Sequence, residues 1–321
     1  MNNLCKDRVN NVEIGVEGED QRIDNYLLRL LKGVPKSHVY RILRSGEVRV
    51  NGGRAGPSRR LTLGDKVRIP PIRVAQKIQE LNPIDPEEFK ILHEDEHILA
   101  IDKPAGLAVH GGSGVSSGLI EQLRATRPNQ PFLELIHRLD KDTSGVLLLA
   151  KRRSALTNLH AQIRKDQTRK IYLTLVWGSW DCQISKVDLS LRKYVSKAGE
   201  RRVVVDRANG KPSLTLFKLL EANEQTSLIE ANLKTGRTHQ IRVHLAHINY
   251  PILGDDKYGD FRRNKLFQKY GLKRMFLHAH QFSFKHPKLG NKITLESPLP
   301  MELHQLMRSI DESHKSQGQD N

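Results

Sequence analysis

The sequence predicts an α+β protein made of two parts: a small N-terminal domain and a larger domain on a mostly antiparallel sheet. The chain of 321 residues is long enough for two ordinary domains. Residues 75–89 mix Pro83 and Pro86 with acidic residues and show no lasting period, which is typical of a linker. Beyond this stretch, short β-rich runs alternate irregularly with a few helical segments, which favours an α+β domain.

Residues 20–74 predict two helices followed by a hairpin. The segment RIDNYLLRLL has apolar residues at helical spacing, and PKSHVYRILRSG starts with a proline and ends at a glycine. Two short alternating strands follow, in EVRVNGGR and RLTLGDKVRIPP, with turns at Asn51-Gly52 and Gly64-Asp65. Residues 1–19 precede these elements, and we expect them to be flexible.

The larger domain is expected over residues 90–305. Its strand candidates are HILAIDKP, GVLLLAK, RKIYLTLVWG, KPSLTLFKLL, SLIEANL and MFLHAHQFSF. Two segments between them, SALTNLHAQIRK and THQIRVHLAHI, have the composition of helices. Residues 306–321 end in DESHKSQGQDN, which predicts a frayed tail.

Positive charge is concentrated in the N-terminal part. The whole chain has 53 Lys and Arg against 36 Asp and Glu, a formal net charge of +17. Residues 21–74 hold 13 of these basic residues and 3 of the acidic ones, and therefore contribute +10. A basic, folded chain suggests a polyanionic partner, most often nucleic acid. A membrane surface is the rival interpretation, but no apolar run of 18 residues and no terminal basic amphipathic helix supports it.

Cysteine usage and the N-terminus indicate a cytoplasmic protein. Cys5 and Cys182 are far apart and form no CxxC pair, so the pattern predicts neither a disulfide framework nor a cysteine-based zinc site. The segment MNNLCKDRVNN lacks the apolar core of a secretory signal.

The segment HRLDKDTSG, residues 137–145, gathers several chemically active side chains. His137, Asp140 and Ser144 could form a hydrolase triad, but TSG is not a nucleophile elbow. HRLD is similar to the kinase catalytic loop, yet no Gly-rich phosphate loop with a VAIK-like strand precedes it. From the residues alone, the better interpretation is a polar turn before a buried strand, in which Gly145 supplies a special backbone angle.

Histidines elsewhere in the chain raise the question of a metal site. His239, His244 and His247, or His278 and His280, could supply ligands, but their spacings match no established pattern such as HExxH. We therefore expect no metal in this protein.

Four ordered motifs resemble those of the RluA-type pseudouridine synthases. HRLDKDTSG is similar to the family's catalytic-aspartate motif HRLDxxTSG. DKPAGLAVH, RKIYL and TGRTHQIRVHL resemble the other motifs and stand in the expected order. The N-terminal helices and hairpin resemble an S4-like RNA-binding domain, which several family members carry. The resemblance covers about residues 20–300 and implies the pseudouridine synthase fold.

The resemblance implies an isomerase that converts uridine to pseudouridine. Runs such as KGVPKS, VHGGSG and LELIHRLD are most similar to members that modify bacterial large-subunit (23S) ribosomal RNA, so this RNA is the expected partner. The reaction moves the uracil from an N1 to a C5 linkage without gaining or losing atoms, and no cofactor is therefore expected. We further expect a monomer with no membrane partner. The alternative is a non-catalytic RNA-binding ribosome assembly factor that keeps the same fold.

The resemblance also assigns residues to the site. It makes Asp140 the catalytic carboxylate, but leaves open whether this group attacks the sugar, attacks the ring or removes a ribose proton. Arg242 matches the basic residue that pairs with the aspartate, and Tyr172 matches the tyrosine that stacks on the uracil and could remove the C5 proton. Arg138 resembles the arginine that enters the gap left by the flipped base.

Further RNA contacts are expected in the N-terminal domain. Lys36, Arg41, Arg44 and Arg49 lie on or next to its second predicted helix, and their charges suit contacts to phosphates.

Overall fold

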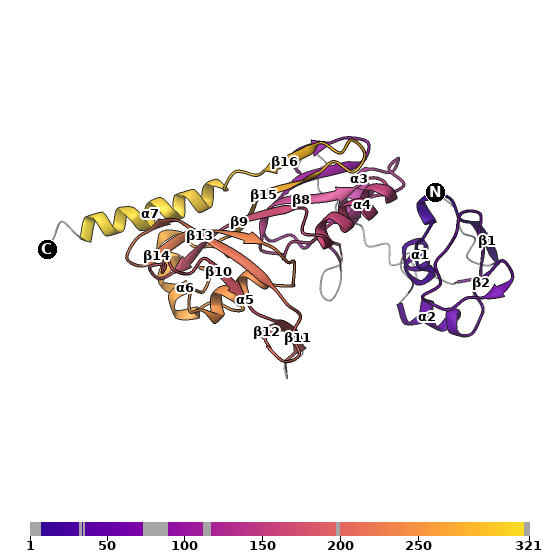
Figure 1. Cartoon of the computed structure of the whole chain (residues 1–321), viewed down its shortest axis with the longest axis horizontal. Helices are drawn as coiled ribbons and strands as arrows, with labels where there is room; N and C mark the ends of the chain where they lie inside the picture. Colours follow the sequence, from indigo (N-terminus) through magenta and orange to yellow (C-terminus); the bar gives the residue numbers. More distant parts are fainter. Residues whose placement is uncertain are drawn as a thin grey trace. The chain divides into compact units, whose positions relative to one another are not determined.

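The computed structural model describes residues 8–31, 34, 36–72, 89–111, 117–196 and 200–317. The chain divides into two compact units, residues 1–82 and 83–321 (Figure 1). The division lies within the segment 75–89 that we expected to be a linker. Of that segment, only Phe89 belongs to the described residues.

The first unit packs two helices against a small antiparallel sheet. Its elements are β1 (Asn10–Glu13), η1 (Val16–Gly18), α1 (Ile23–Leu30), α2 (Lys36–Arg44), β2 (Arg49–Val50), β3 (Gly53–Arg54) and β4 (Lys66–Ile69). The strands lie in the order β1-β4-β2-β3. Both predicted helices and the turn at Asn51-Gly52 are confirmed, and this turn has the positive φ angles of +50° and +79° that tight hairpins require.

The apolar positions of the two helices form the core of this unit. Ile23 and Leu27 of α1 pack with Val39 and Ile42 of α2, and all four side chains are buried. Burial of a stripe of residues three and four apart is what stabilises a short helix inside a domain.

Both ends of the chain contain structure that the sequence did not predict. Residues 10–13 lie in the segment expected to be flexible, but they form β1 and pair with β4, because Val12 and Ile14 bury their side chains in the core. At the other end, helix α7 (Met301–Gln317) runs into the expected tail. Leu306 and Ile310 of this helix are buried in a core cluster of the second unit.

The second unit is built on one large sheet. Its strands are β5 (Ile91–Glu94), β6 (Ile98–Lys103), β7 (Glu134–Leu135), β8 (Ser144–Ala150), β9 (Arg169–Trp177), β10 (Lys186–Asp188), β13 (Leu214–Ala222), β14 (Thr226–Leu233), β15 (Leu277–Lys285) and β16 (Lys292–Glu296). The order is β10-β13-β14-β9-β15-β8-β6-β5, with β16 beside β15 and β7 beside β8. Among the described strands only β8 and β15 pair in parallel, which confirms the predicted α+β class with a mostly antiparallel sheet.

Helices and a separate hairpin complete this unit. The helices are α3 (Leu119–Thr126), α4 (Arg153–Arg164), α5 (Gln240–His247), α6 (Phe261–Phe267), η3 (Gln268–Tyr270) and α7. Strands β11 (Leu191–Val195) and β12 (Arg201–Val205) form the hairpin, which projects from the body of the unit in Figure 1. Helix α4 contacts β8 and β15, and α5 contacts β12 and β13. No described helix is long and apolar enough to cross a membrane.

Gly145 allows the two parallel strands to approach each other. Its φ angle is +109°, and a Cβ atom at this position would lie 2.2 Å from the carbonyl oxygen of Ala279 on β15. Only glycine fits both requirements, which confirms the special backbone angle predicted for this position. The close approach brings the turn before β8 next to the centre of the sheet.

Candidate active site

One cavity of about 360 Å³ is lined by residues from three of the four motifs. Its wall is formed by the turn before β8, the end of α4, the start of β9 and the segment that leads into α5. Its polar lining includes His137, Arg138, Asp140, Arg164, Lys170, Tyr172, His239 and Arg242. Segments that are distant in the sequence therefore meet at this cavity.

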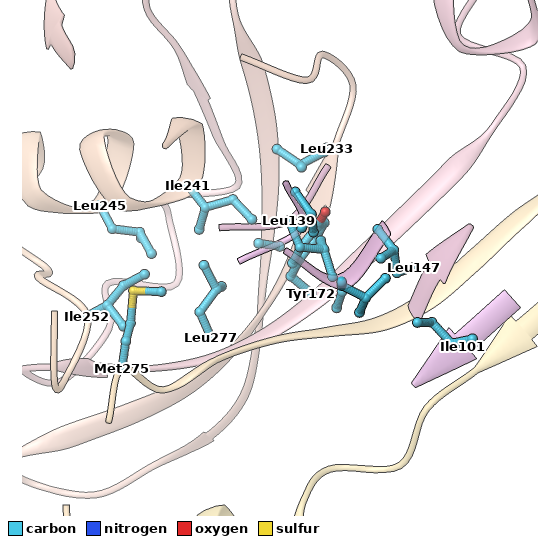
Figure 2. Close-up of a cluster of buried hydrophobic side chains, with 14 of the residues drawn as sticks. Ile101, Leu139, Leu147, Tyr172, Leu233, Ile241, Leu245, Ile252, Met275 and Leu277 are labelled. Atoms are coloured by element: carbon cyan, nitrogen blue, oxygen red, sulfur yellow. The ribbon is translucent and has the colours of Figure 1, made fainter. Parts of the chain in front are cut away.

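All four residues of HRLD line the cavity. Leu139 is buried in the main core cluster, where it lies close to Tyr172 (Figure 2). Arg138 and Asp140, on either side of Leu139, line the cavity, and Arg138 is exposed. The backbone oxygen of Asp140 accepts a hydrogen bond from the Thr143 amide at 3.2 Å, which closes the turn before β8.

Asp140, Arg242 and Asp255 form a linear ion network. Nη1 of Arg242 donates to Oδ2 of Asp140 at 2.9 Å. On its other side, Nε and Nη2 of Arg242 donate to the two carboxylate oxygens of Asp255, each at 2.7 Å. The Asp255 side chain is 1% exposed and that of Asp140 is 26% exposed. The guanidinium is therefore anchored by a buried carboxylate and presented to a carboxylate that ligands can reach.

The pKa shifts of Arg242 and Asp255 favour the charged form of both groups in this network. Burial works to lower the pKa of Arg242, but the hydrogen bonds and charges of Asp255 and Asp140 raise it above its ordinary value. Burial works to raise the pKa of Asp255, but the hydrogen bond and charge of Arg242 hold it below its ordinary value. Asp255 also accepts the backbone N–H groups of Lys257 and Tyr258 at 2.8 and 3.0 Å.

A tight turn sets the start of α5 and so the position of Arg242. Oε1 of Gln240 accepts from the hydroxyl of Thr235 at 2.8 Å and from the amide of Arg237 at 3.0 Å. Nε2 of Gln240 donates to the Leu214 carbonyl at 3.0 Å. His239 precedes the helix with a φ angle of +53°, a conformation that non-glycine residues rarely adopt and that is frequent at functional sites.

His239 also faces the carboxylate of Asp140. Its Nε2 lies 3.8 Å from Oδ1 of Asp140, and its Nδ1 lies 2.8 Å from the hydroxyl of Tyr258. The Tyr258 oxygen accepts the amide of Val203 at 2.9 Å, so its own proton can go to Nδ1. Burial lowers the pKa of His239, which favours a neutral ring whose remaining proton on Nε2 points towards Asp140.

Tyr172 lies in the middle of the central strand β9. Its side chain is buried, and burial together with the charge of Asp140 raises the pKa of the phenol. The ring therefore keeps its proton at neutral pH. No other described residue forms a hydrogen bond with its hydroxyl.

Lys103 of the DKPAG motif supports the turn that carries Asp140. Its side chain is fully buried, and Nζ donates to the carbonyl oxygens of Pro104, Leu107 and Lys141 at 2.7, 2.8 and 3.0 Å. Three acceptors match the three protons of an ammonium group. Burial lowers the pKa of Lys103 to about 7.

The described residues form neither a hydrolase triad nor a metal site from the residues named above. Ser144 bonds to Nδ1 of His278 at 2.9 Å, whereas Nε2 of His137 accepts the amide of Leu148 at 3.1 Å, so His137 and Ser144 form no triad with Asp140. His244 bonds to the hydroxyls of two residues, Ser213 and Thr215. The described residues contain no cluster of three or more groups that could hold a metal ion.

The cations predicted in the first unit lie apart from this cavity in the chain. Arg41, Arg44 and Arg49 are exposed, and none of them is within ion-pair distance of a described carboxylate. Lys36 is the first residue of α2, and its side chain lies outside the described part.

Sequence reasoning missed Asp255 and Tyr258 and gave His239 no role beyond a rejected metal ligand. The segment GDDKYG contains the one available signal, because an acidic residue followed by polar residues is typical of a turn in which the carboxylate accepts backbone amides. That signal does not reveal a partner 13 residues earlier in the chain.

Comparisons with known proteins agree with this architecture. The RNA pseudouridylate synthase family matches residues 97–247, and the S4 domain matches residues 21–67. The solved human RNA pseudouridylate synthase domain containing 4 is 28% identical with a TM-score of 0.54, over 68% of this chain and 93% of that one. The human domain containing 1 is 26% identical with a TM-score of 0.53, over 68% and 86%.

Curated bacterial relatives are similar over nearly the whole chain. Ribosomal large subunit pseudouridine synthase C of Pasteurella multocida is 50% identical, over 92% of each protein. The proteins of that name in Haemophilus influenzae and Escherichia coli K12 are each 49% identical, over 97% and 93% of this chain and 98% and 96% of theirs. The chain therefore belongs to the RNA pseudouridylate synthase family and has an N-terminal S4 domain.

Proposed function

We propose that this protein isomerises uridines of bacterial large-subunit ribosomal RNA to pseudouridine, with Asp140 as the catalytic carboxylate. The names of the three bacterial relatives support this substrate, and the S4 domain supports an RNA partner. We infer that the protein acts in the bacterial cytoplasm, where this RNA is made.

The ion network at Asp140 carries the proposal. A reachable carboxylate is fixed by a guanidinium that a second, fully buried carboxylate holds in place. A protein that only bound RNA would gain nothing from an acid inside a basic cavity, because the carboxylate would repel phosphates. This favours the enzyme over the assembly-factor alternative.

The other residues suit the steps that isomerisation requires. The N1–C1′ bond must break, the uracil must turn, and C5 must join C1′, all in a closed pocket with the base out of its stack. Tyr172 offers a buried ring next to Asp140 on which the uracil can stack. The exposed guanidinium of Arg138 at the cavity wall suits insertion into the gap left by the flipped base.

A second hollow extends the basic surface beside the cavity. It has a volume of about 420 Å³ and shares residues 236–238 with the wall of the first cavity. Arg192, Lys193 and Lys211 also line it. We infer that the strand flanking the target uridine runs along this hollow and is held by phosphate contacts.

Pseudouridine mapping of ribosomal RNA tests the proposed function. RNA from cells that lack the protein should lose one or more large-subunit pseudouridines, and a plasmid copy should restore them. An unchanged map would exclude large-subunit RNA as the substrate.

Asp140→Asn should abolish turnover but keep RNA binding. The amide keeps the size and one acceptor of the carboxylate but loses its charge and nucleophilicity, so we expect the single-turnover rate to fall more than about a thousandfold. The dissociation constant for RNA should stay within about threefold, because phosphate contacts dominate affinity. Substantial turnover by the verified Asn variant would contradict the assignment.

Tyr172→Phe separates stacking from proton transfer. Because no described residue bonds to the Tyr172 hydroxyl, the substitution removes no hydrogen bond within the described chain and should leave thermal stability unchanged. If the hydroxyl moves a proton, the single-turnover rate at saturating enzyme should fall about a hundredfold, and this is the result we expect. A rate close to that of the wild type would leave stacking as its only role, and full rates for both the Phe and the Ala variants would remove Tyr172 from the site.

Asp255→Asn should weaken both the fold and the chemistry. The variant leaves Arg242 buried with its anchor neutralised, so we expect the free energy of unfolding at pH 7 to fall by about 3 kcal/mol and the single-turnover rate to fall about a hundredfold. The exposed pair of Glu96 with Arg152 provides the control, and Glu96→Gln should cost less than about 1 kcal/mol.

The pH dependence of the Asp255→Asn effect identifies its origin. The pKa of Asp255 is depressed in the folded protein, so its contribution is fully present above the unfolded value of 3.8 and is lost as the pH falls further. The stability difference between the wild type and the variant should therefore shrink below about pH 4, as followed by chemical denaturation. A difference that is constant between pH 3 and pH 7 would attribute the loss to packing alone.

Deletion of the first unit should impair binding and site choice but not the chemistry. The two units have separate cores, and the first holds the exposed Arg41, Arg44 and Arg49 but none of the cavity residues. Residues 83–321 should bind long ribosomal RNA more weakly and with a flatter salt dependence, yet modify a short stem-loop at the rate of the whole chain. An unchanged salt slope, or an equal loss on both RNAs by a folded fragment, would contradict this division of labour.

A further inference from the structure

Lys170 is a buried lysine that has no ion-pair partner among the described residues. It lies on β9 two residues before Tyr172, and its side chain is only 6% exposed. In a strand, residues two apart point to the same face, and both side chains line the cavity that holds Asp140. Within the described ranges, Lys170 forms no side-chain hydrogen bond and no ion pair.

The other buried cations among the described residues of this unit, Lys103 and Arg242, are paired with protein oxygens. Lys103 donates to three carbonyl oxygens, and Arg242 donates to two carboxylates. Burial lowers the pKa of Lys170 and the charge of Asp166 works to raise it, but the Asp166 carboxylate is exposed and is already paired with Lys234 at 3.2 Å. A buried, unpaired ammonium group destabilises a folded protein, so its presence at a cavity wall indicates that a ligand supplies the partner.

Three other residues that line the cavity, Arg138, Arg164 and His137, offer Lys170 no free acceptor. Arg138 and Arg164 are cations and donate only. The one acceptor nitrogen of neutral His137 is taken by the amide of Leu148, and burial followed by the charge of Lys170 lowers the pKa of this ring to about 3. Besides Asp140 and its partner Arg242, the exposed guanidiniums of Arg138, Arg164 and Arg237 and the buried amine of Lys170 line this cavity, an arrangement suited to an anionic ligand.

We propose that Lys170 binds an anionic oxygen of the nucleotide held in the cavity and is a further substrate-binding residue of this site. The proposal rests on the proposed function, which supplies the nucleotide. Two kinds of oxygen share this chemistry. One belongs to the phosphate next to the target uridine, and the other to the uracil ring, whose oxygens gain negative charge if the electrons of the N1–C1′ bond stay with the base.

Lys170→Met tests the proposal, because it keeps the length of the side chain and removes the charge. Lys218→Met, on an exposed position of β13, is the control for losing one positive charge. Thermal unfolding of the RNA-free protein gives the structural readout. We expect the melting temperature of Lys170→Met to equal or exceed that of the wild type, whereas a purely structural lysine predicts a decrease.

RNA binding is measured in the Asp140→Asn background, so that no turnover is needed. Adding Lys170→Met to that variant should raise the dissociation constant for a stem-loop by about tenfold or more, or Lys170→Met alone should lower the single-turnover rate by about tenfold or more. The control Lys218→Met should change either quantity by less than about twofold. Unchanged values within twofold for both Lys170→Met and Lys170→Gln would overturn the proposal. If the wild type isomerises no ribosomal RNA, the proposed function fails, and the binding comparison still decides the role of Lys170.

A stem-loop with an uncharged methylphosphonate at the phosphate 5′ to the target uridine separates the two oxygens. If Lys170 binds that phosphate, the wild type and Lys170→Met should be equal on the modified RNA. If it binds a uracil oxygen, Lys170→Met should lose the same factor on both RNAs. Either result supports an anionic oxygen as the ligand. Lys170 would have a structural role only if both Lys170 variants lose melting temperature and RNA affinity together while the single-turnover rate at saturating enzyme stays unchanged.

Discussion

The buried guanidinium of Arg242 is the group on which the site depends. An arginine in the interior needs charged partners on its donors, and here Asp255 satisfies two of them and Asp140 a third. Asp255 lies almost completely out of solvent and is itself tied to backbone amides, so it cannot follow the guanidinium if that group moves. The buried Asp255 therefore fixes Arg242, and Arg242 in turn fixes the solvent-accessible carboxylate of Asp140.

Two backbone devices bring these charges together from distant parts of the chain. Gly145 lets β8 approach β15 so closely that no side chain fits between them, and this places the turn with Asp140 against the centre of the sheet. The turn at residues 235–239, held by Gln240, starts α5 so that Arg242 faces that turn. Neither device touches a substrate, but a small shift in either would separate the carboxylate from its partner.

The sequence predicted most of the fold because local patterns there agree with tertiary packing. The helices at residues 23–30 and 36–44 and the long strands of the sheet bury the residues that their periodicity indicated. It failed at β1 and α7, since four mostly polar residues and a polar tail carry little signal and are held by a few buried side chains such as Val12 and Ile310. In the site, motif resemblance gave Asp140 and Arg242, but the buried anchor Asp255 depends on long-range packing and was not found.

Buried cations in this unit divide into two kinds, and the difference separates structure from function. Lys103 and Arg242 donate to protein oxygens, so the folded protein itself compensates for the burial of their charges. Lys170 has no such partner within the described chain and lies at a cavity wall beside Tyr172. The buried charge of Lys170 destabilises the free protein. An anionic ligand would compensate this charge, so binding becomes more favourable. The same reasoning explains why an acid and several cations can line one cavity. Because Arg242 pairs with the carboxylate of Asp140, the other cations stay available to the substrate.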